Sequence, residues 1–257
     1  MPVFALTLSS LLVLYVALLR PVLRRKRYQK FAQEVVVNPA LRSQYYLRTS
    51  FVLWSWVVVI GIVLFLSSVS PSVLGVRAPG NWTYTLLILI EILVLLPLVV
   101  VIMVRRLVKT RRPGQAKALL KIKELLPSTA HERRLWLLLS ISAGICEELL
   151  FRGFLPWYFL ALGAFFGRQI SLLPVFALST FLFGFAHLYQ GWKGVLGTGL
   201  LGAVFAFLYV FTGNLIVPIV FHILIDARLV FFAPTLLSLD RQMKAEDGAS
   251  RVGTPLL

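Results

Sequence analysis

Long apolar stretches separated by short polar segments run along the whole chain. A helix needs about 20 mainly apolar residues to cross the hydrocarbon core of a bilayer. Stretches of this kind lie near residues 4–19, 51–69, 85–104, 135–150, 154–167, 171–188, 194–212 and 215–232. The fifth is short and could form a tilted or partial span. The pattern predicts an all-α fold, a polytopic transmembrane helix bundle with about eight spans.

The composition supports this fold class. Hydrophobic residues make up 59% of the 257 residues, more than the core of a soluble protein needs. The single cysteine, Cys146, excludes an internal disulfide and lies in an apolar segment. We therefore expect an integral, multi-pass membrane protein without a soluble domain.

Basic residues are concentrated in two segments between the apolar stretches. The excess behind the net charge of +16 lies in residues 20–48 and 105–134, whereas residues 70–84 contain only Arg77. Because cytoplasmic loops are enriched in Lys and Arg, both basic loops are expected in the cytoplasm and the N-terminus outside. Alternation of eight spans puts the C-terminal tail outside as well. This charge flanks the membrane, so the expected partner is anionic lipid and not nucleic acid.

Polar residues interrupt three of the later apolar stretches. A charge near the bilayer centre costs about 2.5 to 3.5 kcal/mol, so such groups are expected to face a shared protein interior. Glu148 and Arg152 are four residues apart, on one helix face, where an ion pair can order the carboxylate. Glu147 points about 100 degrees away from its neighbour. It is therefore free to titrate as a general base or acid.

Two histidines complete the predicted polar site. His187 follows Phe183 by one helical turn, so the phenyl ring can shield one side of the imidazole. His222 and Asp226 are again four residues apart, so the carboxylate can orient the imidazole or fix its tautomer. With the two glutamates, these residues bring carboxylates and imidazoles from three helices to one site.

Two chemistries fit this set of residues. In one, a glutamate activates water and a histidine with its neighbour stabilises the oxyanion of an acyl-transfer step, without a metal. In the other, Glu147, His187 and His222 bind zinc, whose water is the nucleophile. The chain has no H-E-x-x-H motif, so a zinc site would have to be built across helices.

Three motifs carry a resemblance to a known family. Residues 147–152 (EELLFR) are similar to the E-E-x-x-x-R motif of the CPBP family of intramembrane proteases, which includes the CAAX prenyl endopeptidases and bacterial Abi-type proteins. Residues 183–187 (FGFAH) resemble its F-x-x-x-H motif, and residues 222–226 (HILID) resemble its H-x-x-x-N/D motif. The order along the chain agrees as well, and the resemblance covers roughly residues 135–230.

The resemblance implies an intramembrane endopeptidase acting on membrane-associated peptides or proteins, most simply in a bacterial inner membrane. Glu147 would activate the water with assistance from His187, while His222 and Asp226 would line the oxyanion side. The metal-free glutamic mechanism is favoured over zinc. The CAAX enzymes tend to have asparagine at the position of Asp226, and an ionised aspartate cannot donate to an oxyanion. Asp226 is therefore protonated, or it orients His222, or the site uses metal.

The chain divides accordingly into three parts. Residues 1–134 form N-terminal transmembrane helices with the two basic loops, residues 135–233 form a CPBP-like catalytic bundle, and residues 234–257 form a polar tail.

Two functions from other classes use the same buried groups. A proton-coupled transporter also needs buried Glu, His and Asp, but it predicts internal repeats, and none is visible in the sequence. A membrane scaffold that keeps the fold and binds a partner without cleaving it is the other alternative, because a complete motif set shows capacity and not turnover.

Overall fold

The computed structural model describes residues 2–110 and 120–252, and all regular structure in this part of the chain is helical. The α-helices are α1 (Val3–Leu14), α2 (Arg20–Val37), α3 (Leu41–Leu66), α4 (Trp82–Thr110), α6 (Ala130–Glu148), α7 (Leu155–Phe165), α8 (Leu172–Phe185), α9 (Trp192–Thr212) and α10 (Ile216–Val252). Shorter helical turns of other types are η1 (Tyr15–Leu19), η2 (Pro71–Leu74), η3 (Leu120–Leu125), η4 (Leu149–Phe154) and η5 (Leu188–Gln190). The predicted all-α class is confirmed.

Five helices of the described residues are long and apolar enough to cross a membrane, at residues 3–37, 41–66, 82–99, 192–212 and 216–242. The expected number of about eight spans is not confirmed. The fourth and fifth predicted helices are instead one continuous helix, in which the π-helical segment η4 joins α6 to α7. Pro156 does not break this helix, because it occupies the first turn of α7.

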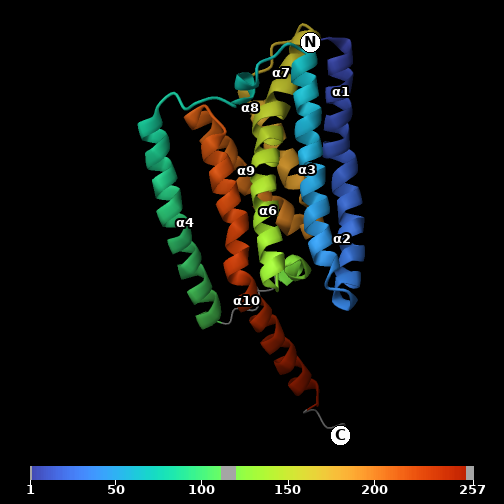
Figure 1. The fold of residues 1–257 in the computed structure, drawn as a ribbon, viewed down its shortest axis with the longest axis vertical. Coiled ribbons are helices and arrows are strands. Elements are labelled where there is room, and N and C mark those ends of the chain that lie inside the picture. Colours follow the sequence, from blue (N-terminus) through green and yellow to red (C-terminus); the bar gives the residue numbers. More distant parts are fainter. Residues whose placement is uncertain (1, 111–119, 253–257) are drawn as a thin grey trace.

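The helices run alternately up and down the bundle (Figure 1). The α2–α3 connection and the start of α6 lie at the same end, as expected for two cytoplasmic basic loops, although residues 111–119 are outside the described part. Much of the first basic segment is helix, since α2 continues the first span without a break. Because the fourth and fifth predicted helices are joined, α10 also ends at the basic end, contrary to the expectation from eight spans.

The helix formed by α6 and η4 lies in the middle of the bundle, between α3 and α10, and α8 packs against α9 (Figure 1). Gly144 allows α10 to approach α6 closely, since a Cβ at this position would lie 2.4 Å from Cγ1 of Ile223. Earlier on α6, the indole Nε1 of Trp136 donates to the backbone oxygen of Asp226 at 2.9 Å. These contacts fix the register in which α10 faces the glutamates of α6.

The start of α6 is fixed by a capping box. The Thr129 hydroxyl accepts a hydrogen bond from the Glu132 N–H at 3.1 Å, and the Glu132 carboxylate accepts one from the Thr129 N–H at 3.2 Å. Glu132 also receives a hydrogen bond from Nη1 of Arg42 on α3 at 2.9 Å. The cap thus ties the first turn of the central helix to α3.

Candidate active site

Glu148 is at the centre of a buried polar cluster. It is fully buried at the last residue of α6, and its Oε1 accepts a hydrogen bond from Nη1 of Arg152 at 3.0 Å. The same oxygen accepts a second hydrogen bond from Nδ1 of His222, on α10, at 2.7 Å. The ion pair between Glu148 and Arg152 expected from their spacing is confirmed. Glu148 therefore holds the side chains of two helices in fixed positions.

Arg152 also contacts groups of α8 and α9. It is 1% exposed, and its Nη2 donates to the backbone oxygen of Gly202 on α9 at 2.9 Å. Its guanidinium lies 4.2 Å from the ring centroid of Phe183 and 5.2 Å from that of Phe205. A planar cation between aromatic faces gains both electrostatic and packing energy. Arg152 is thus a fixed part of the framework around Glu148.

Gly202 makes room for this arginine. A Cβ at this position would lie 2.7 Å from the Phe183 ring and 3.1 Å from Nη2 of Arg152. The π-helical segment that carries Arg152 is tied to α8, because the hydroxyl of Ser179 donates to the backbone oxygen of Phe151. A π-helical turn leaves backbone groups without their usual helical partners, and Ser179 satisfies one of them.

His222 lies between two carboxylates. Its Nδ1 faces Glu148, and its Nε2 is 3.6 Å from Oδ2 of Asp226, one turn later on α10. With a proton on each nitrogen, the ring donates toward a carboxylate on each side. Phe205 stacks on the imidazole with ring centroids 4.9 Å apart. The predicted contact between His222 and Asp226 is therefore present. Its length is within the range of an ion pair but too long for a close hydrogen bond.

Glu147 has surroundings different from those of Glu148. It is also buried, at 5% exposure, but no hydrogen bond or ion pair reaches its carboxylate from the described residues. It lines a cavity of about 290 Å³, and His187, His222 and Asp226 line the same cavity. The two adjacent glutamates are thus divided as their helical spacing predicts, one clamped and one unpaired.

His187 has a defined tautomer. Its Nδ1 is 2.9 Å from the backbone oxygen of Phe183, and a carbonyl oxygen only accepts, so Nδ1 carries a proton. The neutral ring therefore has its lone pair on Nε2. The Phe183 ring lies 5.1 Å from the imidazole, as expected from their spacing. The charges of Glu147 and Asp226 act on this ring from across the cavity.

The three residues of the zinc alternative do not form a metal site in the described part of the chain. No group of three His, Cys, Asp or Glu side chains there is arranged to hold a metal ion. Both nitrogens of His222 face carboxylate oxygens, and Nδ1 of His187 is bound to a backbone oxygen. Of the three residues, His187 keeps Nε2 available to a ligand, whereas both nitrogens of His222 are directed at carboxylates.

Several residues around the site are not visible from sequence spacing. Arg24 and Tyr189 line the same cavity as Glu147, and the guanidinium of Arg24 lies 4.1 Å from the Tyr189 ring centroid. Arg24 belongs to a charged segment that the sequence assigns to a loop, 123 positions from Glu147 by residue number. The sequence signal that could have found it is the absence of Gly, Asn, Asp or Ser between the first apolar stretch and the basic segment. Pro21 lies there, but it occupies the first turn of α2 and does not break the helix.

A protein-family description, Type II CAAX prenyl endopeptidase Rce1-like, matches residues 130–228. The matched region begins at the first residue of α6 and ends within α10, so it contains all six predicted site residues. No curated protein and no solved structure gives a significant match to the chain.

Proposed function

Because residues 130–228 match the Rce1-like family of type II CAAX prenyl endopeptidases, we propose that this protein hydrolyses peptide bonds of membrane-associated substrates with water activated by Glu147. One observation carries the assignment of roles. Glu148 is bound through Oε1 by Arg152 and His222 and does not line the cavity, whereas the Glu147 carboxylate lines it without a hydrogen bond from the described residues. Of the two glutamates, Glu147 is the one in a position to accept a proton from a bound water.

In the proposed mechanism, water lies between two acceptors. The Glu147 carboxylate takes its proton, and the unprotonated Nε2 of His187 accepts its second hydrogen and turns the oxygen lone pair toward the substrate carbonyl. The hydrogen bond from Nδ1 of His187 to Phe183 supports this role, because it fixes both the tautomer and the ring position. After attack, the proton on Glu147 passes to the leaving amine, which balances the reaction.

His222 is the proposed stabiliser of the oxyanion. Its Nε2 is 3.6 Å from Asp226, too far for a close hydrogen bond, so an N–H at this position is available to a carbonyl oxygen bound in the cavity. Asp226 acts in this proposal as the group that orients His222. It does not donate to the oxyanion itself. Glu148 and Arg152 are positioning residues, since they hold His222 from the other side.

The proposed substrate class follows from the family match and the setting. The family name points to CAAX prenyl peptides, and we propose the broader class of peptide or protein segments held at a membrane, with bacterial inner membrane as the location. Arg24, Lys193 and Arg228 line the cavity of Glu147. Such cations support binding of a segment that approaches from the basic end of the bundle.

The test compares new protein N-termini in membranes of cells that express the native chain or Glu147→Gln at equal abundance. Peptides produced only with the native chain are expected, and they identify the substrate. Glu91→Gln is the matched control, because Glu91 is exposed on α4 and outside the site. Identical peptide profiles for the native chain and Glu147→Gln would overturn the proposal in favour of transport or a scaffold role.

A further inference from the structure

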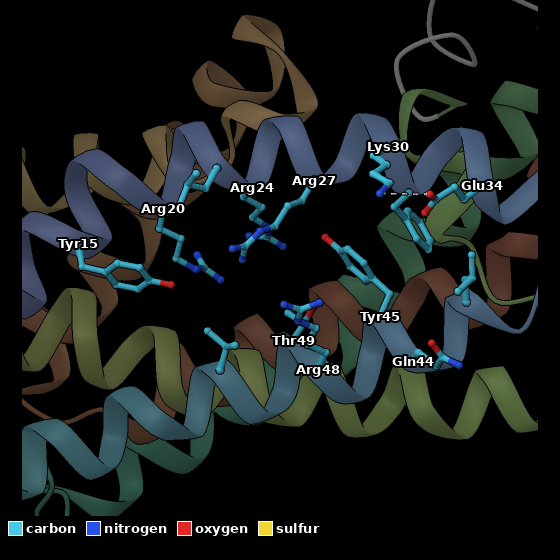
Figure 2. Close-up of a pocket in the computed structure, with 14 residues that line it drawn as sticks. Tyr15, Arg20, Arg24, Arg27, Lys30, Glu34, Gln44, Tyr45, Arg48 and Thr49 are labelled. Carbon is cyan, nitrogen blue, oxygen red and sulfur yellow. Dashed lines mark ion pairs between the residues drawn. The ribbon is translucent and has the colours of Figure 1, made fainter.

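A second cavity, of about 410 Å³, lies between α2 and α3, next to the cavity of Glu147. Its walls are strongly basic (Figure 2). Five cationic side chains line it, namely Arg20, Arg24, Arg27, Lys30 and Arg48. The close-up shows that the guanidinium groups of Arg20, Arg24 and Arg27 extend from α2 toward Arg48 on α3.

Little of this charge is neutralised by the protein. Glu34 is the one acidic residue on the wall, and it pairs with Lys30 at 3.6 Å, at one end of the cavity. No ion pair in the described part of the chain involves the four arginines. The charge of Glu147 acts on Arg20 and Arg24 without forming an ion pair with either in the described part of the chain. A cluster of this kind has several positive charges available for a ligand.

Two of the arginines carry donors that are buried without an acceptor. Nη1 of Arg20 and Nη1 of Arg24 have no hydrogen-bond partner among the described residues, although Arg20 is only 7% exposed. Both side chains are held by aromatic rings, Arg20 over Trp56 at 4.2 Å and Arg24 over Tyr189 at 4.1 Å. Buried charged donors without partners are strongly unfavourable, so these preoriented groups indicate a missing anionic acceptor.

The cavity lies where two apolar segments end, which is the depth expected for lipid head groups. Arg20 directly follows the apolar part of the first helix, and Arg48 directly precedes the apolar part of α3. We infer that this cavity binds the phosphate groups of an anionic membrane lipid that carries more than one negative charge. A guanidinium group can donate two parallel hydrogen bonds to the oxygens of one phosphate. Four such groups are more than a single carboxylate can pair with.

The site would also influence the wall of the Glu147 cavity. Arg24, Tyr45 and Thr49 line both cavities. A bound head group that takes up the free donor of Arg24 would therefore fix a side chain that the two cavities share. The inference does not depend on proteolysis, since its readout is lipid binding by the full-length protein.

The experiment measures binding of cardiolipin, which has two phosphates, to the full-length protein in neutral detergent by native mass spectrometry. Replacing two arginines of the cavity, in Arg27→Gln/Arg48→Gln, is expected to raise the dissociation constant about tenfold or more. The matched control is Arg25→Gln/Lys26→Gln, which removes the same charge from residues of α2 that do not line the cavity. The control is expected to change the constant by no more than about twofold.

Three results would overturn the inference. If cardiolipin binding is weakened equally in the cavity variant and in the control variant, the lipid is attracted to the charge of the basic helix and not to the cavity. Binding of inorganic pyrophosphate as tight as that of cardiolipin would show a site for soluble phosphate and not for lipid. Competition by a peptide with a free C-terminal carboxylate, but not by its amide or by cardiolipin, would assign the cavity to substrate. If the double variant does not fold, Arg48→Gln alone provides the same comparison.

Discussion

Nδ1 of His222 lies 2.7 Å from Oε1 of Glu148, although the two residues are 74 positions apart in the chain. The carboxylate oxygen that receives this hydrogen bond also receives one from Arg152. Because Glu148 is fully buried, these two donors are the partners that keep its charge stable. The contact connects the last helix of the bundle to the central helix at the point where the candidate site begins.

Removal of the Glu148 charge is expected to destabilise the protein. Glu148→Gln leaves Arg152 buried without its carboxylate, and breaking a buried ion pair in this way costs about 3 to 5 kcal/mol. The midpoint of thermal unfolding in detergent should fall clearly, followed by tryptophan fluorescence. Glu91→Gln, at an exposed position on α4, should leave the midpoint nearly unchanged. A similar midpoint for both variants would mean that the cluster contributes no net stability.

Gly202 offers a second test of the framework around Arg152. Gly202→Ala places a methyl group 2.7 Å from the Phe183 ring, and overpacking of this kind costs about 1 to 3 kcal/mol. Gly197 lies on the same helix, and a methyl group added there would meet no atom of another helix within 4 Å. Gly197→Ala should be neutral or stabilising by up to about 1 kcal/mol, because alanine has the higher helix propensity. The measurement is the midpoint of thermal unfolding of each variant. Equal midpoints for Gly202→Ala and Gly197→Ala would contradict the prediction.

The role of Asp226 is tested by its conversion to the amide. If the negative charge orients His222, Asp226→Asn should lower kcat about 10- to 100-fold, less than the loss of a general base or acid, which is about 10²- to 10⁴-fold. The measurement is turnover of a peptide identified in the N-terminal comparison. Unchanged or higher turnover would instead assign the side chain a direct donor role toward the oxyanion.

Chelators distinguish the two chemistries. A glutamic mechanism predicts that turnover survives prolonged treatment with 1,10-phenanthroline, and that the purified protein contains far less than one zinc ion per chain by elemental analysis. Loss of turnover that zinc restores would favour the metal mechanism, since a catalytic zinc supplies the nucleophilic water.

Glu132 provides a prediction on pH. Burial acts to raise the pKa of this carboxyl, but the hydrogen bonds from Ser128 and the charge of Arg42 outweigh it and hold the pKa below its ordinary value of 4.5. A lowered pKa in the folded state means that the charged group stabilises the fold fully above pH 4.5 and loses this effect as the pH falls through the lowered value.

The pH prediction is measured with a matched variant. Glu132→Gln should unfold more easily than the native chain at pH 7, by about 1 to 3 kcal/mol, because the cap and the charged hydrogen bonds are weakened. The difference should shrink as the pH falls from 4.5 through the lowered pKa of the native carboxyl, because the unfolded chain takes up its proton first. A difference that stays constant between pH 7 and pH 3 would exclude this contribution from ionised Glu132.

Spacing along single helices predicted part of the site correctly. The Glu148–Arg152 and His222–Asp226 pairs follow from four-residue separation, which needs no knowledge of the fold. The contact between Glu148 and His222 joins two helices, and its register depends on packing at Gly144 that no periodicity reveals. The roles assigned to these residues stay predictions.

The sequence was less informative about helix ends. The expected break between the fourth and fifth helices is absent, because a π-helical segment carries the chain through Arg152 and Gly153. Likewise, the charges from Arg20 onward suggested a loop, but a helix can continue beyond the hydrocarbon core once its side chains reach head groups. Polar composition marks the end of a span, not the end of a helix.

The shared hydrogen bonds of Glu148 also set an order for the assembly of the protein. During synthesis α6 emerges before α10, so Glu148 and Arg152 reach the membrane while His222 is still to be made. The helix of α6 is not among those apolar enough to cross unaided in the described part of the chain, whereas the first 27 residues of α10 are. The candidate site is therefore completed only when the last span is inserted, and the unfinished chain is without the arrangement on which cleavage would depend.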